Sequence, residues 1–413
     1  MKSAALCLTF LAAFVLVAPS PSAAENWPGW RGGRGDGTSL ETDVPTQWSG
    51  ASNVAWKTPI PGSGHSSPIV WDDRIFLTTA LAETQDRLLL CLDRKTGRIL
   101  WQKTVLKAPL EAMQKENSPA SSTPVTDGQE VFVTFLDGSH VVVAALDFSG
   151  RERWLVRPGD FKSQWGFAHS PVLFEDKVIV ACQSKGENFI VALSRADGAT
   201  RWKVALKNPS QSYSPPLIRE MGGRVQMVVP GNSAVTSYDP KDGRELWAVD
   251  GPSTDFVAAP AYNAKAGLVL CSSSWPSRIL LAIQPDGQGN VTASKVAWKT
   301  PEGAPYVPSP IAVGEYFLTA AYNKSAYCYE AATGKILWKQ ENMGLHHASP
   351  VTAGGLVYFL NDDGVMNVVK AGPKFDPVAR NELGEKTYAS PAISQGQIFL
   401  RSFNNLYAIG PTK

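Results

Sequence analysis

Hydrophobic residues in this chain come in short runs that polar turns interrupt at regular intervals. The stretch 68–80, PIVWDDRIFLTTA, holds two such runs around an Asp-Asp turn, and LLLCLD at 88–93 is a third. The turn RKTG then leads into RILWQK at 98–103. Short runs rich in Val, Ile, Leu, Phe and Tyr, bounded by Gly, Asp and Asn, predict β-strands joined by hairpins. Each unit therefore supplies four strands, and no stretch beyond the N-terminus sustains a helical period.

This unit recurs along the chain. A small residue followed by proline precedes each first strand, and these prolines are 40 to 56 residues apart, the period of propeller blades. The eight pairs are Ser67-Pro68, Thr123-Pro124, Ser170-Pro171, Ser214-Pro215, Ala259-Pro260, Ser309-Pro310, Ser349-Pro350 and Ser390-Pro391. We therefore predict an all-β fold, an eight-bladed β-propeller of four-stranded antiparallel blades.

A second landmark ends most units. It is an aspartate turn with a glycine, followed four residues later by tryptophan, as in CLDRKTGRILW at 91–101. Aspartate can accept hydrogen bonds from backbone amides, and glycine supplies positive φ. The strand that follows is the outermost of its blade, an edge that an indole packed between neighbouring blades would protect. We predict this structural role for Trp56, Trp101, Trp154, Trp202, Trp247, Trp298 and Trp338.

The last unit, from residue 389 onward, holds only three strands. The missing fourth is at the other end of the chain, where NVAWKT at 53–58 nearly repeats KVAWKT at 295–300. We expect residues 53–58 to complete the last blade, so that residues 53–413 form a closed ring and the array of blades has no open ends. The seventh unit lacks its tryptophan, which leaves its outer strand the least defined.

The N-terminus predicts export. Lys2 precedes a short apolar stretch, and the small residues Ser22 and Ala24 suit a signal peptidase, so we expect residues 1–24 to be a signal peptide. The alternative is an uncleaved anchor. The protein would then be periplasmic or extracellular. Residues 25–52 form a lead-in that we expect to wrap the outside of the ring. Its Arg34-Gly35-Asp36 matches an integrin-binding tripeptide, which we interpret as coincidence.

Charge and cysteine content narrow the partners. Charged residues make up 18% of the chain and the net charge is +2, without the clustered basic footprint that nucleic acids require. No later stretch is apolar enough to be a transmembrane segment. The four cysteines after the leader are isolated, and we favour buried thiols over disulfides: Cys91, Cys182, Cys271 and Cys328. We expect a monomer.

The alternating Asp, Gly and Trp landmarks resemble the pyrroloquinoline-quinone-type (quinoprotein-like) propeller repeat over nearly all of residues 53–410. That resemblance implies one of two functions. Quinoprotein dehydrogenases hold the quinone (PQQ) and a calcium ion on the propeller axis, whereas the BamB-like branch is non-enzymatic. The run 26–48 also resembles the lead-in of the dehydrogenases.

The missing features favour the BamB-like branch. The dehydrogenases typically carry adjacent cysteines against the quinone, and this chain has no Cys-Cys pair. They also bind calcium with Glu, Asn and Asp, whereas the carboxylates here mostly fall in turns. We therefore expect a non-catalytic scaffold or ligand-binding module of the cell envelope, with no cofactor, no catalytic residue and no metal site. A PQQ-dependent oxidoreductase of alcohols or sugars is the alternative.

Four of the five histidines lie just before the small-residue–proline pairs. Because equivalent slots of a propeller lie at the same height around the axis, residues near these slots should ring one mouth of the central channel. We predict that an envelope protein or a small ligand binds there. The candidates are His65, His169, His346, His347, Trp165, Tyr213, Tyr306 and Tyr388.

Two other interpretations of the mouth stay open. The histidines could form a metal site, although they come from the first, third and seventh units and need not converge. The side chains could instead form a polar collar around a water-filled channel. Solvated histidines would titrate near neutral pH. The fifth histidine, His140, is expected in a surface hairpin loop.

Overall fold

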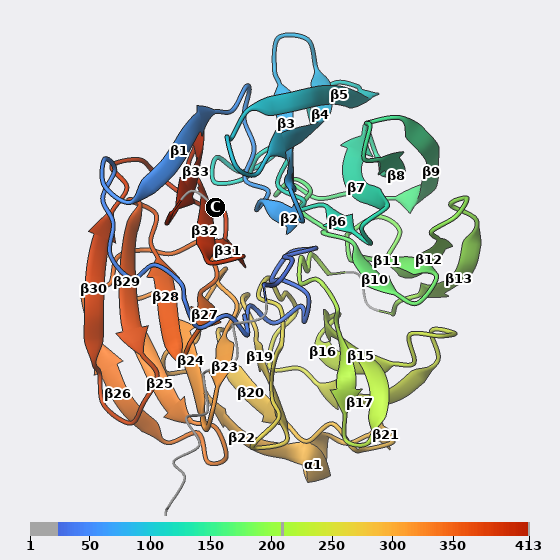
Figure 1. Cartoon of the computed structure of the whole chain (residues 1–413). Helices are drawn as coiled ribbons and strands as arrows, with labels where there is room; N and C mark the ends of the chain where they lie inside the picture. Colours follow the sequence, from blue (N-terminus) through green and yellow to red (C-terminus); the bar gives the residue numbers. More distant parts are fainter. Residues whose placement is uncertain (1–23, 208–209, 412–413) are drawn as a thin grey trace, which may run out of the picture.

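The computed structural model describes residues 24–207 and 210–411, and the predicted signal peptide therefore lies almost entirely outside the described residues. Eight antiparallel sheets are arranged in a ring around a common axis, as predicted (Figure 1). The inner strands of several neighbouring blades contact one another near the axis, as β18 does with β23 and β2 with β6 and β31. Among the described residues the single helix is α1 (Thr292–Lys295), and none is long and apolar enough to cross a membrane.

From the axis outward, blades 1 to 4 consist of β2 (Ile69–Trp71), β3 (Arg74–Leu81), β4 (Asp86–Asp93) and β5 (Ile99–Lys107); β6 (Val125–Thr126), β7 (Glu130–Asp137), β8 (His140–Asp147) and β9 (Glu152–Asp160); β10 (Val172–Phe174), β11 (Lys177–Cys182), β12 (Phe189–Ser194) and β13 (Thr200–Ala205); β14 (Leu217–Met221), β15 (Arg224–Gly231), β16 (Ala234–Tyr238) and β17 (Glu245–Asp250).

Blades 5 to 8 consist of β18 (Ala261–Asn263), β19 (Leu268–Ser272), β20 (Leu280–Ile283) and β22 (Val296–Thr300); β23 (Ile311–Val313), β24 (Tyr316–Ala320), β25 (Ala326–Glu330) and β26 (Ile336–Gln340); β27 (Val351–Ala353), β28 (Leu356–Leu360), β29 (Val365–Lys370) and β30 (Pro377–Glu382); β31 (Ala392–Ser394), β32 (Gln397–Arg401), β33 (Asn405–Ile409) and β1 (Val54–Pro59). Blade 7 thus has its outer strand without the tryptophan. Blade 4 gains a fifth strand, β21 (Gly289–Asn290), parallel to β17.

The ring is closed by the first strand of the chain. β1 pairs antiparallel with β33, so that Trp56 faces Ala408 and Thr58 faces Leu406 across the sheet. Blade 8 therefore combines residues from both ends of the chain, as the repeat at 53–58 predicts. Closure gives blade 8 its fourth strand and joins the last blade of the ring to the first.

The apolar core lies between the blades. In β4, Leu88, Leu90 and Leu92 pack in the cluster shared with blade 8, whereas Leu89 and Cys91 pack in the cluster shared with blade 2. Because successive side chains of a strand point to opposite faces, a strand buried on both faces must be apolar throughout. The four cysteines after residue 24 are all buried and unpaired, each in a different blade.

The docking tryptophans contact the following blade in six cases out of seven. Their indole N–H groups donate to backbone carbonyls in the turn before the outer strand of the next blade: Trp56 to Arg94, Trp101 to Phe148, Trp154 to Arg195, Trp202 to Pro240, Trp298 to Ala331 and Trp338 to Gly372. Trp247 differs, since it donates to Gln226 Oε1 of its own blade at 2.7 Å. At this position the parallel strand β21 pairs with β17, so that Trp247 faces Gly289 across the sheet.

The small residues before the prolines form a chain of hydrogen bonds around the axis. In each such bond the backbone N–H of one small residue donates to the hydroxyl of its counterpart in the next blade. Six of these bonds occur, at 2.9 to 3.0 Å: Ser67 to Thr123, Thr123 to Ser170, Ala259 to Ser309, Ser309 to Ser349, Ser349 to Ser390, and Ser390 to Ser67. The last one spans the closure between blades 8 and 1.

The lead-in does not wrap the outside of the ring as predicted, except near its end. It crosses one face of the ring, at the ends of the inner strands (Figure 1). The backbone of Trp27 exchanges hydrogen bonds with Val70 of blade 1, and the buried Arg31 donates to the Pro310 carbonyl of blade 6 at 2.8 Å. Only further along does it reach an outer strand, where the Trp48 N–H donates to Asn381 of blade 7. Local sequence could not predict this path, because its contacts are with distant residues.

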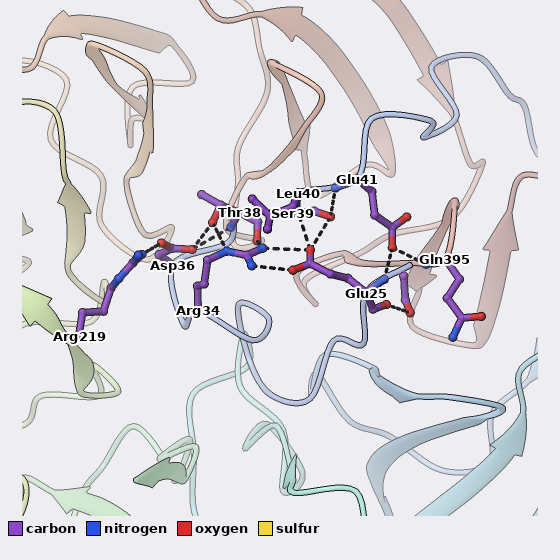
Figure 2. Close-up of polar contacts among 10 residues, drawn as sticks. Glu25, Arg34, Asp36, Thr38, Ser39, Leu40, Glu41, Arg219 and Gln395 are labelled. Carbon is purple, nitrogen blue, oxygen red and sulfur yellow. Dashed lines mark hydrogen bonds and ion pairs between the residues drawn. The ribbon is translucent and has the colours of Figure 1, made fainter. Parts of the chain in front are cut away.

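The tripeptide Arg34-Gly35-Asp36 is engaged within the protein. The Arg34 guanidinium forms two hydrogen bonds with the Glu25 carboxylate, at 2.6 and 3.0 Å, and Asp36 pairs with Arg219 on β14 (Figure 2). Both charged side chains therefore have internal partners. This finding supports the interpretation of the tripeptide as coincidence.

Candidate functional site: the axial mouth

A cavity of about 130 Å³ lies on the propeller axis, where the inner strands begin. Residues from all eight blades and Trp30 of the lead-in line it: His65, Ser67, Ser121, Thr123, Ala168, Ser170, Tyr213, Pro215, Val257, Val307, His347, Ser349, Tyr388 and Ser390. Because the lead-in contacts the far ends of the inner strands, Trp30 approaches the cavity from the opposite face. The open side is the mouth predicted from the sequence.

Four of the eight predicted residues line the cavity: His65, Tyr213, His347 and Tyr388. The other four do not. His169 and His346 are buried, with 2% and 4% of their surfaces exposed, while Tyr306 and Trp165 are more exposed but outside the lining.

Position relative to the small residue of each pair explains the difference. Side chains two positions before it line the cavity in blades 1, 7 and 8, as His65, His347 and Tyr388. His169 and His346 are one and three positions before it. Alternate residues of an extended chain face opposite sides, so odd positions turn away from the axis. The spacing to the small residue is visible in the sequence, but the prediction treated all nearby histidines and aromatic residues alike.

Blade 4 is shifted by one residue. There Tyr213 and Pro215, on either side of Ser214, face the cavity. The Ser214 hydroxyl turns to the Pro215 carbonyl at 3.3 Å and takes no place among the six bonds around the axis. One register change thus accounts for both the lining by Tyr213 and the interruption of the hydroxyl chain at blade 4.

Blades 7, 8 and 1 bring two histidines together on one tyrosine. The His347 ring stacks on Tyr388 with centroids 4.2 Å apart, and His65 lies 5.0 Å from the same ring. Phe403 packs against both Tyr388 and His65, at 4.9 and 5.1 Å. His347 Nδ1 is 2.9 Å from Asp362 Oδ2, which fixes the ring. The expectation that these histidines need not converge is therefore wrong for His65 and His347.

The buried histidines do not titrate near neutral pH. Burial lowers the pKa of His65 to about 3, with further contributions from Arg401 and His347. Burial likewise lowers the pKa of His169 and His346 to about 4. The expectation of solvated histidines is wrong for these three, whose imidazoles are neutral at neutral pH.

A polar network fixes Tyr213, which lines the cavity from blade 4. The Tyr213 hydroxyl shares a short hydrogen bond with Ser163, and Ser163 donates to Gln211 Oε1 at 3.0 Å. Asp255 Oδ1 accepts the Gln211 N–H at 3.1 Å, and burial raises the pKa of this carboxyl. Apart from Tyr213, these residues lie outside the cavity lining, which on this side consists mostly of small or apolar residues, whereas the histidine side is aromatic.

Exposed aromatic side chains surround the mouth, and the sequence did not single out three of them. Trp275 is 60% exposed, Tyr322 53% and Phe403 36%, and each lies in a loop between the second and third strands of its blade. Trp165, 36% exposed, is in the loop before β10. In an antiparallel blade both kinds of loop lie on one face. Contacts of Tyr322 with Tyr306 and of Phe403 with Tyr388 confirm this placement. We call Trp165, Trp275, Tyr322 and Phe403 the aromatic rim.

The cavity does not fit a quinone with calcium. Its lining contains no carboxylate, whereas calcium requires several oxygen ligands, usually including carboxylates. Within residues 24–207 and 210–411, no group of three His, Cys, Asp or Glu residues could hold a metal ion. The cavity is also smaller than the roughly 300–1,000 Å³ of ordinary ligand pockets.

Solved structures share this fold at low sequence identity. BamB from Moraxella catarrhalis matches with a TM-score of 0.60 and 15% identity, covering 86% of this chain and 99% of that one. A quinohemoprotein alcohol dehydrogenase from Pseudomonas putida matches with a TM-score of 0.67 and 11% identity, covering 93% of this chain and 80% of that one. Another such dehydrogenase, from Comamonas testosteroni, has a TM-score of 0.52 and 12% identity, covering 95% and 82%.

These likenesses show the fold alone, since every identity is below 25% and they include both BamB and alcohol dehydrogenases. None of the curated proteins matches the sequence. The family model described as outer membrane protein assembly factor BamB matches residues 46–145 and 138–371, well over half of the chain. The chain therefore belongs to the BamB family of eight-bladed propellers.

Proposed function

We propose that this protein is an exported, non-catalytic scaffold that docks a protein of the cell envelope on its mouth face. The observation that carries the proposal is the aromatic rim. Most other large side chains of this chain are buried in the blades, whereas these four are exposed around one opening. Exposed aromatic residues on loops of a rigid frame are typical anchors of protein interfaces.

Membership of the BamB family suggests the kind of partner. The family is named for outer-membrane protein assembly, so the partner we propose is a protein of that assembly process. The mouth cavity alone would admit only a small group. A side chain of the partner could enter it, while the partner's surface packs on the rim.

Substitution of the rim tests this proposal. We expect the Trp275→Ser, Phe403→Ser double variant to lose most of the partner that copurifies from envelope extracts with the unchanged protein. The matched control is Val225→Ser, Val378→Ser, since these valines are 43% and 41% exposed but lie on strands away from the mouth. Equal retention of the partner by both variants would show that the interface does not include the rim.

The enzymatic alternative has its own discriminating experiment. Pyrroloquinoline quinone and calcium are added to the purified protein, and the visible spectrum and dye reduction by alcohols or sugars are followed. The scaffold proposal expects neither a new chromophore nor dye reduction, because the cavity lining offers no carboxylate for calcium. A bound quinone with substrate-dependent reduction would overturn it.

A further inference from the structure

A buried carboxylate anchors the lead-in to the last blade. Only 2% of Glu41 is exposed. Its Oε1 accepts the backbone N–H of Gln395 at 2.5 Å (Figure 2). Its Oε2 accepts the backbone N–H of Gly396, also at 2.5 Å. Both donors lie in the turn between β31 and β32. A third donor is the backbone nitrogen of Glu25, 3.0 Å from Oε1.

No lysine, arginine or histidine in the described part of the chain forms an ion pair with Glu41. Arg94 lies near enough for an electrostatic effect, but its guanidinium donates to Gln397 Oε1 at 2.9 Å. A buried carboxylate with hydrogen bonds but no paired cation is costly. The site therefore favours an additional positive charge.

The backbone nitrogen, the carbonyl and the carboxylate of Glu25 all form hydrogen bonds. Its carbonyl accepts the Ser394 hydroxyl at 2.5 Å, and its carboxylate accepts Arg34, Ser39 Oγ and the Leu40 N–H. The preceding residue, Ala24, is exposed. The peptide bond between Ala24 and Glu25 is also the one at which the sequence predicts cleavage.

We propose that removal of the leader at Ala24–Glu25 creates an α-ammonium group at Glu25 whose partner is the Glu41 carboxylate. Hydrolysis adds water across the peptide bond: the hydroxyl goes to the Ala24 carbonyl carbon and a proton to the Glu25 nitrogen. The freed amine takes a second proton, because its pKa is about 8 in the absence of neighbours. The backbone donor already at Oε1 thus becomes a cation without moving. This inference rests on the export part of the proposed function.

After removal of the leader, the ion pair would stabilise the connection that the lead-in makes between blades 8 and 4. Glu41 bonds to blade 8, and the same lead-in reaches blade 4 through Arg34, Thr38, Asp36 and Arg219 (Figure 2). The other charged groups nearby are the Glu25 carboxylate, which Arg34 neutralises, Asp72, whose Oδ1 accepts Asn26, and Arg94. An ammonium at Glu25 would face mostly acceptors and carboxylates, so its pKa should rise above the usual value.

Amine labelling of the purified mature chain tests the pair directly. Three forms are compared: residues 25–413 with a free Glu25 amine, the same chain carrying Glu41→Gln, and residues 24–413, whose amine lies one residue further out. Because only the neutral amine reacts, a pKa raised by one unit slows labelling of Glu25 about tenfold at pH 7 relative to the other two forms. Equal rates in all three would overturn the pair.

The melting temperature gives an independent measurement. An ammonium whose pKa is raised in the folded state stabilises it below pH 8, and the contribution is lost as the pH rises through the folded-state pKa. The free 25–413 chain should therefore lose about 2 °C more between pH 7 and pH 10 than its N-acetylated form. Identical pH dependence of the two would contradict the proposal even if every variant folds.

Export and the ion pair can fail separately. Mass spectrometry of the full chain, expressed with its leader, shows whether it is processed and at which bond. A mature chain beginning at Glu25 supports the inference, and one beginning at another residue overturns it. A chain left unprocessed in the cytoplasm would contradict export, and the labelling of residues 25–413 would still decide whether Glu41 binds an ammonium.

Discussion

At the scale of single residues, the turn glycine of one blade contacts the docking tryptophan of the blade before it. Gly97 adopts φ 70° in the aspartate turn of blade 1, and a Cβ there would overlap the ring of Trp56 from blade 8. The same contact recurs between Trp154 and Gly198, where a Cβ would lie 2.8 Å from the indole. Glycine is therefore required twice, by its backbone conformation and by the neighbouring indole.

Substitution of two glycines separates these requirements. Gly223 has a similar φ of 77°, but a Cβ there would meet nothing within 4 Å. Gly223→Ala should cost about 1 kcal/mol, from backbone strain alone. Gly97→Ala should cost about 1–3 kcal/mol more, since the indole must move. Urea unfolding measures both free energies, and equal losses would contradict the docking role of Trp56.

The buried histidines predict acid sensitivity. His346 has a pKa of about 4 in the folded protein against about 6.5 when unfolded, with Asp362 and His347 as its charged neighbours. The unfolded chain binds the proton first, so stability is full above pH 6.5 and is lost as the pH falls toward 4. His346→Leu should remove up to about 3 kcal/mol of this loss. An unchanged pH profile between 6.5 and 4 would show that His346 is not the group responsible.

At the scale of elements, the hydroxyl chain explains why serine or threonine precedes proline in most blades. Each hydroxyl accepts the N–H of the preceding blade, so the inner strands are tied by hydrogen bonds as well as by packing. The pairs were visible in the sequence, but their role was not, because the bonds join residues 40 to 56 positions apart or, at the closure, 323 apart.

Ser390 and Ser214 form a matched pair for testing this chain of bonds. Ser390→Ala removes the acceptor for the Ser349 N–H, leaves that buried donor unpaired and should cost about 1–3 kcal/mol. Ser214 accepts no such bond, so Ser214→Ala should cost clearly less. Denaturant unfolding of the two variants is the measurement. A similar cost for both would mean that the hydroxyls contribute little to blade docking.

Local repeats predicted the blades well and the lead-in badly. Blade number and strand order follow from patterns within about 50 residues, and the closure follows from the likeness of residues 53–58 to the outer strand at 295–300. The path of residues 25–41 across the ring depends on contacts such as Arg31 with Pro310 and Glu41 with Gly396, which no local pattern encodes. At the mouth, a one-residue difference in position decided whether His65 or His169 faces the axis.

At the scale of the whole molecule, the two faces of the ring differ. The lead-in covers one face, with Trp30 reaching the axial cavity, while the other face carries the open mouth and the aromatic rim. A scaffold needs a rigid frame and an exposed surface that binds its partner, and the closed ring with its exposed aromatic loops provides both. The mouth face is therefore where we expect a partner to bind.

Site-specific photo-crosslinking in intact cells tests this central claim most directly. A photoreactive residue is placed in turn at positions 275, 322 and 403 on the rim, and at positions 225 and 378 away from it. The account predicts that the three rim positions crosslink to one and the same envelope protein and that the other two do not. Crosslinks from positions 225 and 378, with none from the rim, would contradict it.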